Sequence, residues 1–327
     1  MRRARILPLL LIGMTAAPAS AQTAQSMMNV FDTVGQRQQV DSTTQADDVK
    51  IRKDMNDRMT VAVRVGGSGP FRFLVDTGAD RTAISSAVAA QAGLEFGASA
   101  SLHSVTGISQ VQTATVPNLQ LSQSDIRIVD APVLEAEHMG ADGILGTDSL
   151  KSKRVTFDFE KRIMTIVPAE QRAPREDGTI VVTGKLRSGR LIVTNAVADG
   201  HRITVILDTG SDVSVGNEAL RRSLANSGLV KSTGGVDLES VTGDILHGEY
   251  TFVKKLEVGD VALGNLAVVF ADAHTFEKLG LDKKPALLLG MNALRAFKKV
   301  SIDFASKKLR VILPESGSLE QVMLAAR

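Results

Sequence analysis

The stretch Phe73-Leu74-Val75-Asp76-Thr77-Gly78-Ala79-Asp80 decides the fold, because its pattern returns at Ile206-Leu207-Asp208-Thr209-Gly210-Ser211-Asp212. Each copy is an apolar run followed by Asp-Thr-Gly, one small residue and a second aspartate. The apolar run is typical of a buried strand, and Asp-Thr-Gly is typical of a sharp turn at its end. The Asp-Thr-Gly aspartates are 132 positions apart (208 − 76). Two such turns in matching context indicate a duplicated unit.

Further matched features accompany the two turns in the same order. Each turn follows the second strand of an expected β-hairpin. After the turn come a Ser-Val-Thr-Gly tip, a glycine-flanked apolar segment and a closing pair of strands. The features after the turn occupy residues 104–107 and 240–243, 143–150 and 287–294, and 155–168 and 300–314. A tandem duplication accounts for this order. The sequence therefore predicts an all-β chain of two lobes, 59–168 and 178–314, each with one short helix and joined by a linker, 169–177.

The ends of the chain lie outside the duplication. Residues 1–21 combine early arginines, a short apolar run and Ala19-Ser20-Ala21, the order expected of a secretory signal peptide. The apolar run is too short for a comfortable membrane span, so we expect no stable membrane anchor and a periplasmic or secreted protein after cleavage near Ala21. Residues 22–58 are polar and predict a flexible arm; residues 315–327 form a C-terminal tail.

Composition narrows the possible chemistry. The sequence contains no cysteine, which excludes disulfides and thiolate catalysis. Its five histidines show no ligand spacing, and we expect no metal and no other cofactor. Without residues 1–21, 35 Lys+Arg (38 − 3) stand against 36 Asp+Glu. This near-neutral balance, with no Trp and one Tyr, gives no reason to expect nucleic acid as a partner.

With both turns and their downstream partners in view, the chain resembles the retropepsin-like aspartic proteases. The matching strings are LVDTGAD, ILDTGSD, ILG and LLG, and the similarity covers about residues 59–314. The resemblance implies two tandem β-barrel lobes related by a pseudo-two-fold axis, like two retropepsin protomers fused into one pepsin-style chain. The lobes would then pair within one molecule, and we expect a monomer, because the short linker favours intramolecular pairing.

The resemblance also implies roles for individual residues. Asp76 and Asp208 would form the catalytic dyad. The residues supporting the dyad would be Thr77, Gly78, Ala79, Thr209, Gly210 and Ser211. The residues binding substrate would be Asp80 and Asp212, with Thr106, Gly107, Thr242 and Gly243 at the tips of two flaps.

One position departs from the family pattern. Retropepsins commonly place an arginine directly after the second conserved glycine, where it pairs with the outer aspartate of Asp-Thr-Gly-Ala-Asp. This chain has Thr147 and Met291 there. Asp80 and Asp212 must therefore find other partners or remain free to accept substrate amides.

The two turns differ in the residue after Asp-Thr-Gly, which is Ala79 in one copy and Ser211 in the other. A serine hydroxyl at this place can donate to the carboxylate of its own lobe and favour the ionised form. We therefore expect the negative charge of the dyad on Asp208 and its proton on Asp76.

Paired carboxylates at such turns suit peptide hydrolysis. As known for aspartic-protease dyads, two carboxyl groups held close share one proton, so one can activate a water while the other protonates the scissile carbonyl. The sequence thus predicts an exported aspartic endopeptidase acting on an extended peptide or protein. Three alternatives stay open: a catalytically inactive peptide-binding module, lobes that each pair with their twin in another chain, and a hydrolase of another substrate class.

Overall fold

The computed structural model describes residues 59–121, 124–228 and 234–314, together with the backbone of a few short strands outside them. These strands are β1 (Ala4–Ile6), β2 (Leu10–Gly13), β3 (Asp48–Lys50), β4 (Arg52–Lys53) and β26 (Leu324–Ala326). The expected signal peptide, arm and tail otherwise lie outside the described residues. Within the expected arm, β3 pairs with β14 and β4 pairs with β5, so this part of the arm has strand structure.

The first lobe is a closed β-barrel. Its strands are β5 (Met59–Val65), β6 (Ser68–Val75), β7 (Ala83–Ser85), β10 (Thr113–Leu121), β11 (Ser124–Leu134) and β12 (Gly143–Leu145). They follow the order β10-β11-β7-β12-β6-β5, and pairing of β10 with β5 closes the ring. Alternate residues of β5, including Val61, Val63 and Val65, are buried, because successive side chains of a strand point to opposite faces.

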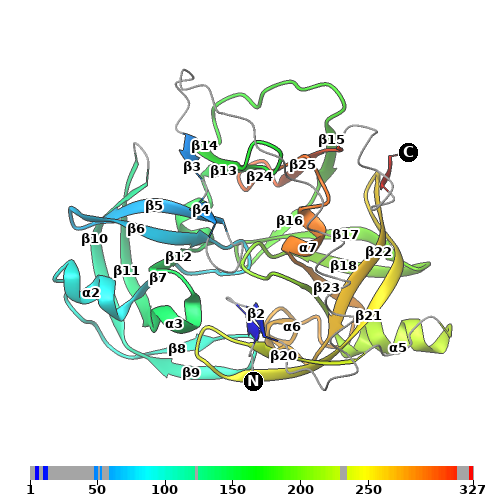
Figure 1. Cartoon of the computed structure of the whole chain (residues 1–327), viewed down its shortest axis with the longest axis horizontal. Coiled ribbons are helices and arrows are strands. Elements are labelled where there is room, and N and C mark those ends of the chain that lie inside the picture. Colours follow the sequence, from blue (N-terminus) through cyan, green and yellow to red (C-terminus); the bar gives the residue numbers. More distant parts are fainter. Residues whose placement is uncertain are drawn as a thin grey trace.

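The second lobe repeats this ring strand for strand (Figure 1). Its strands are β17 (Arg190–Ala198), β18 (His201–Leu207), β19 (Ser214–Gly216), β21 (Ile245–Val258), β22 (Val261–Phe270) and β23 (Ala286–Leu289). The order is β21-β17-β18-β23-β19-β22, and β21 also pairs with β22. The two matching rings confirm the tandem, mostly β architecture that the repeated motifs predict.

A hairpin projects from each barrel. In the first lobe, β8 (Ala100–His103) and β9 (Ile108–Val111) pair only with each other among the described strands. In the second lobe, β20 (Gly234–Glu239) pairs with the beginning of β21. We name residues 100–111 hairpin A and residues 234–250 hairpin B. Their tips are the two Ser-Val-Thr-Gly segments, as the sequence predicts.

Each lobe has three short helices among its described residues, where the sequence predicted one. The helices are α2 (Ser86–Gln91), α3 (Ala136–Met139), α4 (Thr147–Leu150), α5 (Glu218–Asn226), α6 (His274–Lys278) and α7 (Met291–Leu294). The predicted helices are α4 and α7, which follow the conserved glycines. α2 and α5 are capped by the side chains of Ser85 and Asn217, a recognisable helix start. α3 and α6 are single turns, too short to show a helical period.

One sheet is shared by both lobes and lies at the top of Figure 1. Its strands from the lobes are β13 (Lys153–Asp158), β14 (Ile163–Pro168), β15 (Ile180–Thr183), β24 (Lys299–Asp303) and β25 (Lys308–Ile312). The lobes join where β13 pairs antiparallel with β24, with Val155 opposite Ile302. The remaining strand, β16 (Lys185–Arg187), pairs with β17. The lobes of one chain therefore share backbone hydrogen bonds.

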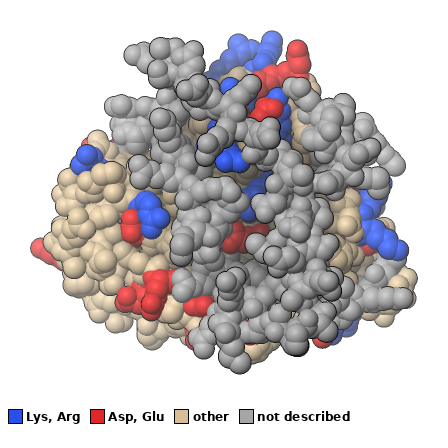
Figure 2. All heavy atoms as spheres, in the orientation of Figure 1, with Lys and Arg blue, Asp and Glu red and all other residues tan. Residues whose placement is uncertain are grey.

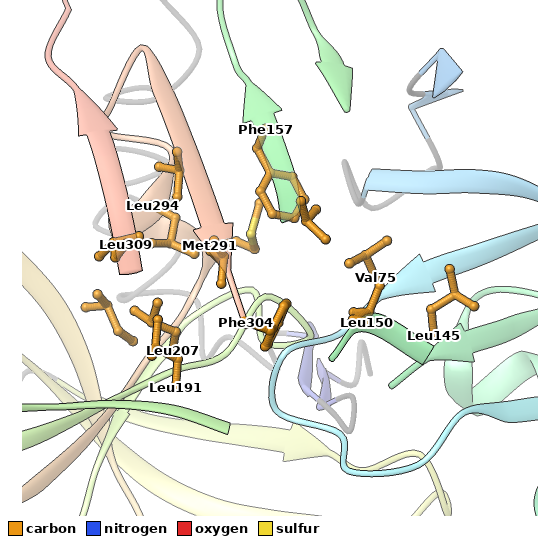
Figure 3. Packing of buried hydrophobic residues seen from close by; sticks show 14 of the residues in the cluster. Val75, Leu145, Leu150, Phe157, Leu191, Leu207, Met291, Leu294, Phe304 and Leu309 are labelled. Carbon is orange, nitrogen blue, oxygen red and sulfur yellow. The ribbon is translucent and has the colours of Figure 1, made fainter. Parts of the chain in front are cut away.

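The apolar core is also continuous between the lobes. In Figure 3, Val75 of the first lobe and Met291 of the second lie on either side of a region that contains Phe157 and Phe304. Both phenylalanine side chains are buried and belong to one cluster with residues of both barrels. Burying one such side chain contributes about 1.5–3 kcal/mol. Each lobe therefore covers apolar surface that the other would expose to water.

The described surface carries both signs of charge. On the face drawn in Figure 2, lysine and arginine side chains are interspersed with aspartate and glutamate over both lobes. Within the described residues, no helix combines the length and the apolar character needed to cross a membrane.

Candidate active site

Asp76 and Asp208 follow two equivalent strands, and the barrels fix their positions. β6 is parallel to β12 in the first lobe, and β18 is parallel to β23 in the second. The backbone N–H of Asp76 donates to the carbonyl of Leu145 at 3.0 Å, and that of Asp208 donates to Leu289 at 3.1 Å. Each aspartate is therefore tied to the strand formed by the glycine-flanked apolar segment of its own lobe, β12 or β23.

Thr77 and Thr209 connect the two turns through four hydrogen bonds. The Thr77 hydroxyl donates to the Leu207 carbonyl at 2.9 Å and accepts from the Thr209 N–H at 3.1 Å. The Thr209 hydroxyl donates to the Val75 carbonyl at 2.7 Å and accepts from the Thr77 N–H at 3.1 Å. Each such bond contributes about 0.5–1.5 kcal/mol net. This reciprocal set braces the turns against each other across the lobe interface.

The two carboxylates face each other across that interface. A Cβ atom added to Gly78 would overlap the Asp208 carboxylate, and one added to Gly210 would overlap the Asp76 carboxylate. Only glycine, which lacks a Cβ, lets the opposite carboxylate come so close to the backbone. Asp76 is 0% exposed and Asp208 is 3% exposed. The structure thus brings one buried carboxylate from each lobe into a single pair.

Burial and proximity raise the pKa of both aspartates. Asp76 Oδ1 accepts from the N–H groups of Gly78 at 2.7 Å and Ala79 at 3.0 Å, while Asp208 Oδ1 accepts from Gly210 at 3.1 Å. Burial, and then the charge of Asp208, raise the pKa of Asp76 well above its ordinary value despite these donors. Burial raises the pKa of Asp208 to about 7, against the lowering effects of a nearby arginine and the Gly210 N–H.

Two carboxylates this close disfavour a double negative charge, and the charge of Asp208 raises the pKa of Asp76. The position of the shared proton on Asp76 stays a prediction, but the cause expected for it is wrong. The Ser211 hydroxyl donates to the Val213 carbonyl at 2.6 Å, so it is directed away from Asp208. The contribution of Ser211 to lowering the pKa of Asp208 comes from its backbone N–H and not from its hydroxyl.

Arg190, which the sequence analysis missed, crosses from the second lobe to the first. It begins β17 and is 6% exposed. Its Nε donates to the Gly78 carbonyl at 2.5 Å, and its Nη2 lies 3.7 Å from Asp80 Oδ1. Its positive charge lowers the pKa of both Asp76 and Asp208. The sequence left open whether Asp80 finds another partner or stays free to accept substrate amides, and nothing in it indicated Arg190.

Asp212 has a cationic neighbour of its own. Arg295, at the C-terminal end of α7, places Nη2 3.9 Å from Asp212 Oδ1. The two outer aspartates are therefore both near arginines, and neither arginine stands directly after the conserved glycine. Of the two outcomes expected for Asp80 and Asp212, other partners or freedom to accept substrate amides, the structure shows an arginine partner for each.

The hairpin tips touch each other. The Thr106 hydroxyl donates to Ser240 Oγ at 3.2 Å, joining hairpin A to hairpin B. Thr242, in contrast, donates to Asp244 Oδ2 within its own tip at 2.7 Å. Gly107 and Gly243 both adopt positive φ, +144° and +82°. Of the four tip residues predicted to bind substrate, Thr106 thus lies at the contact between the hairpins.

Comparison with protein families agrees with this geometry. A family model of gag-polyprotein aspartyl proteases matches residues 61–152, and an aspartyl protease model matches residues 193–293. The comparison with curated proteins found no match. Each matched segment contains one Asp-Thr-Gly turn and most of one barrel. The chain therefore belongs to the retropepsin-like aspartyl protease family and carries two of its lobes in tandem.

Proposed function

We propose that the protein is an aspartic endopeptidase that hydrolyses peptide bonds with a water held between Asp76 and Asp208. The observation that carries this proposal is the buried pair of facing carboxylates, one from each lobe, whose burial raises both pKa values so that the pair can share one proton. Such a pair contains a base and an acid side by side, which water-mediated acyl hydrolysis requires. Membership of an aspartyl protease family supports a protease-type activity.

The proposed reaction needs only these two side chains. Ionised Asp208 takes one proton from the water as the water oxygen bonds to the carbonyl carbon, and Asp76 donates its proton to the carbonyl oxygen. In the second step the carbon–nitrogen bond breaks, and the leaving nitrogen takes a proton from Asp208. The new carboxyl group releases its proton back to Asp76. The dyad then again holds one proton.

The substrate that we propose is an extended peptide lying between the turns and hairpins A and B. Extended peptides bind through backbone hydrogen bonds and side-chain pockets, and Asp80, Asp212 and the hairpin tips are the groups assigned to this contact. We also propose that residues 1–21 direct export, so that the mature protein acts as a monomer in the periplasm or outside the cell.

Cleavage of a peptide library by the purified chain beginning at residue 22 tests the proposed activity. We expect cleavage by the parent protein, none by Asp76→Asn or Asp208→Asn, and unchanged cleavage by Asp282→Asn, a matched change in an exposed turn. If the parent binds peptides but leaves all of them intact from acid to beyond the raised pKa of Asp208, about 7, the protein is an inactive binding module.

A further inference from the structure

Each hairpin tip is held against a short helix of the opposite lobe, and histidine takes part in both contacts. Hairpin A reaches α6 of the second lobe through His103 and His274. Hairpin B reaches α3 of the first lobe through Glu239 and His138. The two contacts occupy equivalent places in the duplicated fold, but their chemistry differs.

The contact of hairpin A is a hydrogen bond between two imidazole rings. His103 Nδ1 lies 2.9 Å from His274 Nε2, and the ring planes differ by 9° with centroids 5.2 Å apart. The other nitrogen of His274, Nδ1, lies 3.0 Å from Glu277 Oε2. The His274 backbone N–H also donates to the Val105 carbonyl at 2.9 Å. Val105 itself is 2% exposed.

The contact of hairpin B is a histidine–carboxylate pair. His138 Nδ1 lies 3.0 Å from Glu239 Oε1, and Glu239 is buried. The Gly243 backbone lies so close to the His138 ring that an added Cβ would come within 2.7 Å of it. The apolar residue of this tip, Val241, is 2% exposed, like Val105 in the other tip.

Protonation affects the two contacts in opposite ways. A hydrogen bond between imidazoles needs one N–H donor and one bare nitrogen. The pair accommodates one added proton, but with two added protons both facing nitrogens carry hydrogen and the bond is lost. A histidine–carboxylate bond instead becomes stronger when the histidine is charged. Acid therefore weakens the hold on hairpin A and strengthens the hold on hairpin B.

The charged groups around the histidines also differ between the two contacts. His103 faces His274 and Lys278 of α6 and, from the first catalytic turn, Asp80. Burial, Lys278 and His274 lower the pKa of His103, while Asp80 raises it. His274 faces Glu277 as well as His103. Within the described residues, the ion pairs of His138 are with two acidic groups, Glu239 and, at 3.7 Å, Glu137.

We propose that hairpin A is an acid-released cover of the dyad, held closed by the His103–His274 pair near neutral pH, while hairpin B stays docked through His138 and Glu239. One hairpin would then open to admit a peptide, although the fold supplies two. This regulation goes beyond the proposed hydrolysis, and its test needs no catalytic turnover.

The sign of the pH effect follows from linkage. Opening exposes His103 to water and returns its pKa toward about 6.5, the ordinary histidine value. Because the closed form holds the His103 proton less well than the open form, closing loses stability as the pH falls below about 6.5. Each pKa unit between the two forms changes the ratio of closed to open protein about tenfold.

The absence of cysteine from the sequence allows a direct test with single thiols. Val105→Cys reports on hairpin A, Val241→Cys reports on hairpin B, and Ala305→Cys, in the exposed turn after β24, gives the reference rate. The probe is a neutral pyridyl disulfide, which reacts in acid as well as at neutral pH. Dividing each rate by that of Ala305→Cys removes the pH dependence of the reagent.

We expect the relative rate at Val105→Cys to rise about tenfold or more from about pH 7 to about pH 4.5, with no rise at Val241→Cys. Adding His103→Asn, which keeps a donor near Nδ1 but does not titrate, should remove the rise, whereas adding His201→Gln, a distant histidine change, should keep it. Equal rises at both thiols, or a rise that survives His103→Asn, would overturn the proposal.

Hydrogen exchange of the unsubstituted chain provides a second measurement that does not depend on the cysteine variants folding. Protection of residues 104–111, corrected for the intrinsic effect of pH, should fall in acid, while protection of residues 240–247 should not. Constant protection of residues 104–111 would contradict the proposal.

Discussion

The buried dyad should make the protein less stable at neutral pH than in acid, and Asp208→Asn should remove the part of this loss that Asp208 contributes. Burial raises the pKa of Asp208 from 3.8 to about 7. The folded protein therefore holds this proton more tightly than the unfolded chain does. Stability contributed by the proton is present below about pH 4 and is lost as the pH rises to about 7.

The size of the effect follows from the same pKa values. The difference between 3.8 and about 7 is roughly three pKa units, and one unit corresponds to about 1.4 kcal/mol, so Asp208 alone accounts for about 4 kcal/mol. Asparagine has nearly the same shape as aspartate but no charge. Asp208→Asn should therefore raise the free energy of unfolding by several kcal/mol more at neutral pH than in acid.

Urea unfolding of the parent protein and Asp208→Asn, at about pH 4 and about pH 7.5 on either side of this titration, measures the difference. Asp282→Asn, in an exposed turn, controls for loss of a surface carboxylate and should show little dependence on pH relative to the parent. If Asp208→Asn changes the free energy of unfolding equally at both pH values, the carboxylate is not held in the buried, raised-pKa state described above.

Three further predictions concern the lobe interface and the hairpins. Arg190→Met removes the cation that lowers the pKa of both dyad aspartates, so the acidic limb of the kcat/KM profile should move to higher pH. Arg190→Lys keeps the charge and is the control. An acidic limb that does not move in Arg190→Met contradicts this role. Mixing Asp76→Asn with Asp208→Asn should restore no cleavage, and rescue would show that lobes pair between chains. Gly107→Val and Gly243→Val should slow turnover while circular dichroism stays unchanged, because both positions have positive φ; normal turnover in both would exclude a role for the tips.

The sequence by itself determined the duplicated architecture. Asp-Thr-Gly after an apolar strand is a local pattern, and its recurrence with the same downstream motifs predicted two equivalent lobes. The extra helices were less accessible: α3 and α6 are single turns, and single turns leave no period in the sequence. The meeting of Asp76 with Asp208 was implied by the resemblance to the retropepsin-like proteases, and each of the two residues ends the equivalent strand of its lobe.

Only the tertiary structure decided which side chains surround the dyad. Arg190 lies 112 positions from Gly78, to whose carbonyl it donates, and His103 lies 171 positions from His274. The Ser211 hydroxyl had two nearby acceptors in principle, and the course of the backbone beyond the turn directed it to Val213. Local patterns specify strands and turns, but contacts between lobes depend on how two folded surfaces pack. The charge around the dyad is therefore a property of the lobe interface, and no single stretch of sequence contains it.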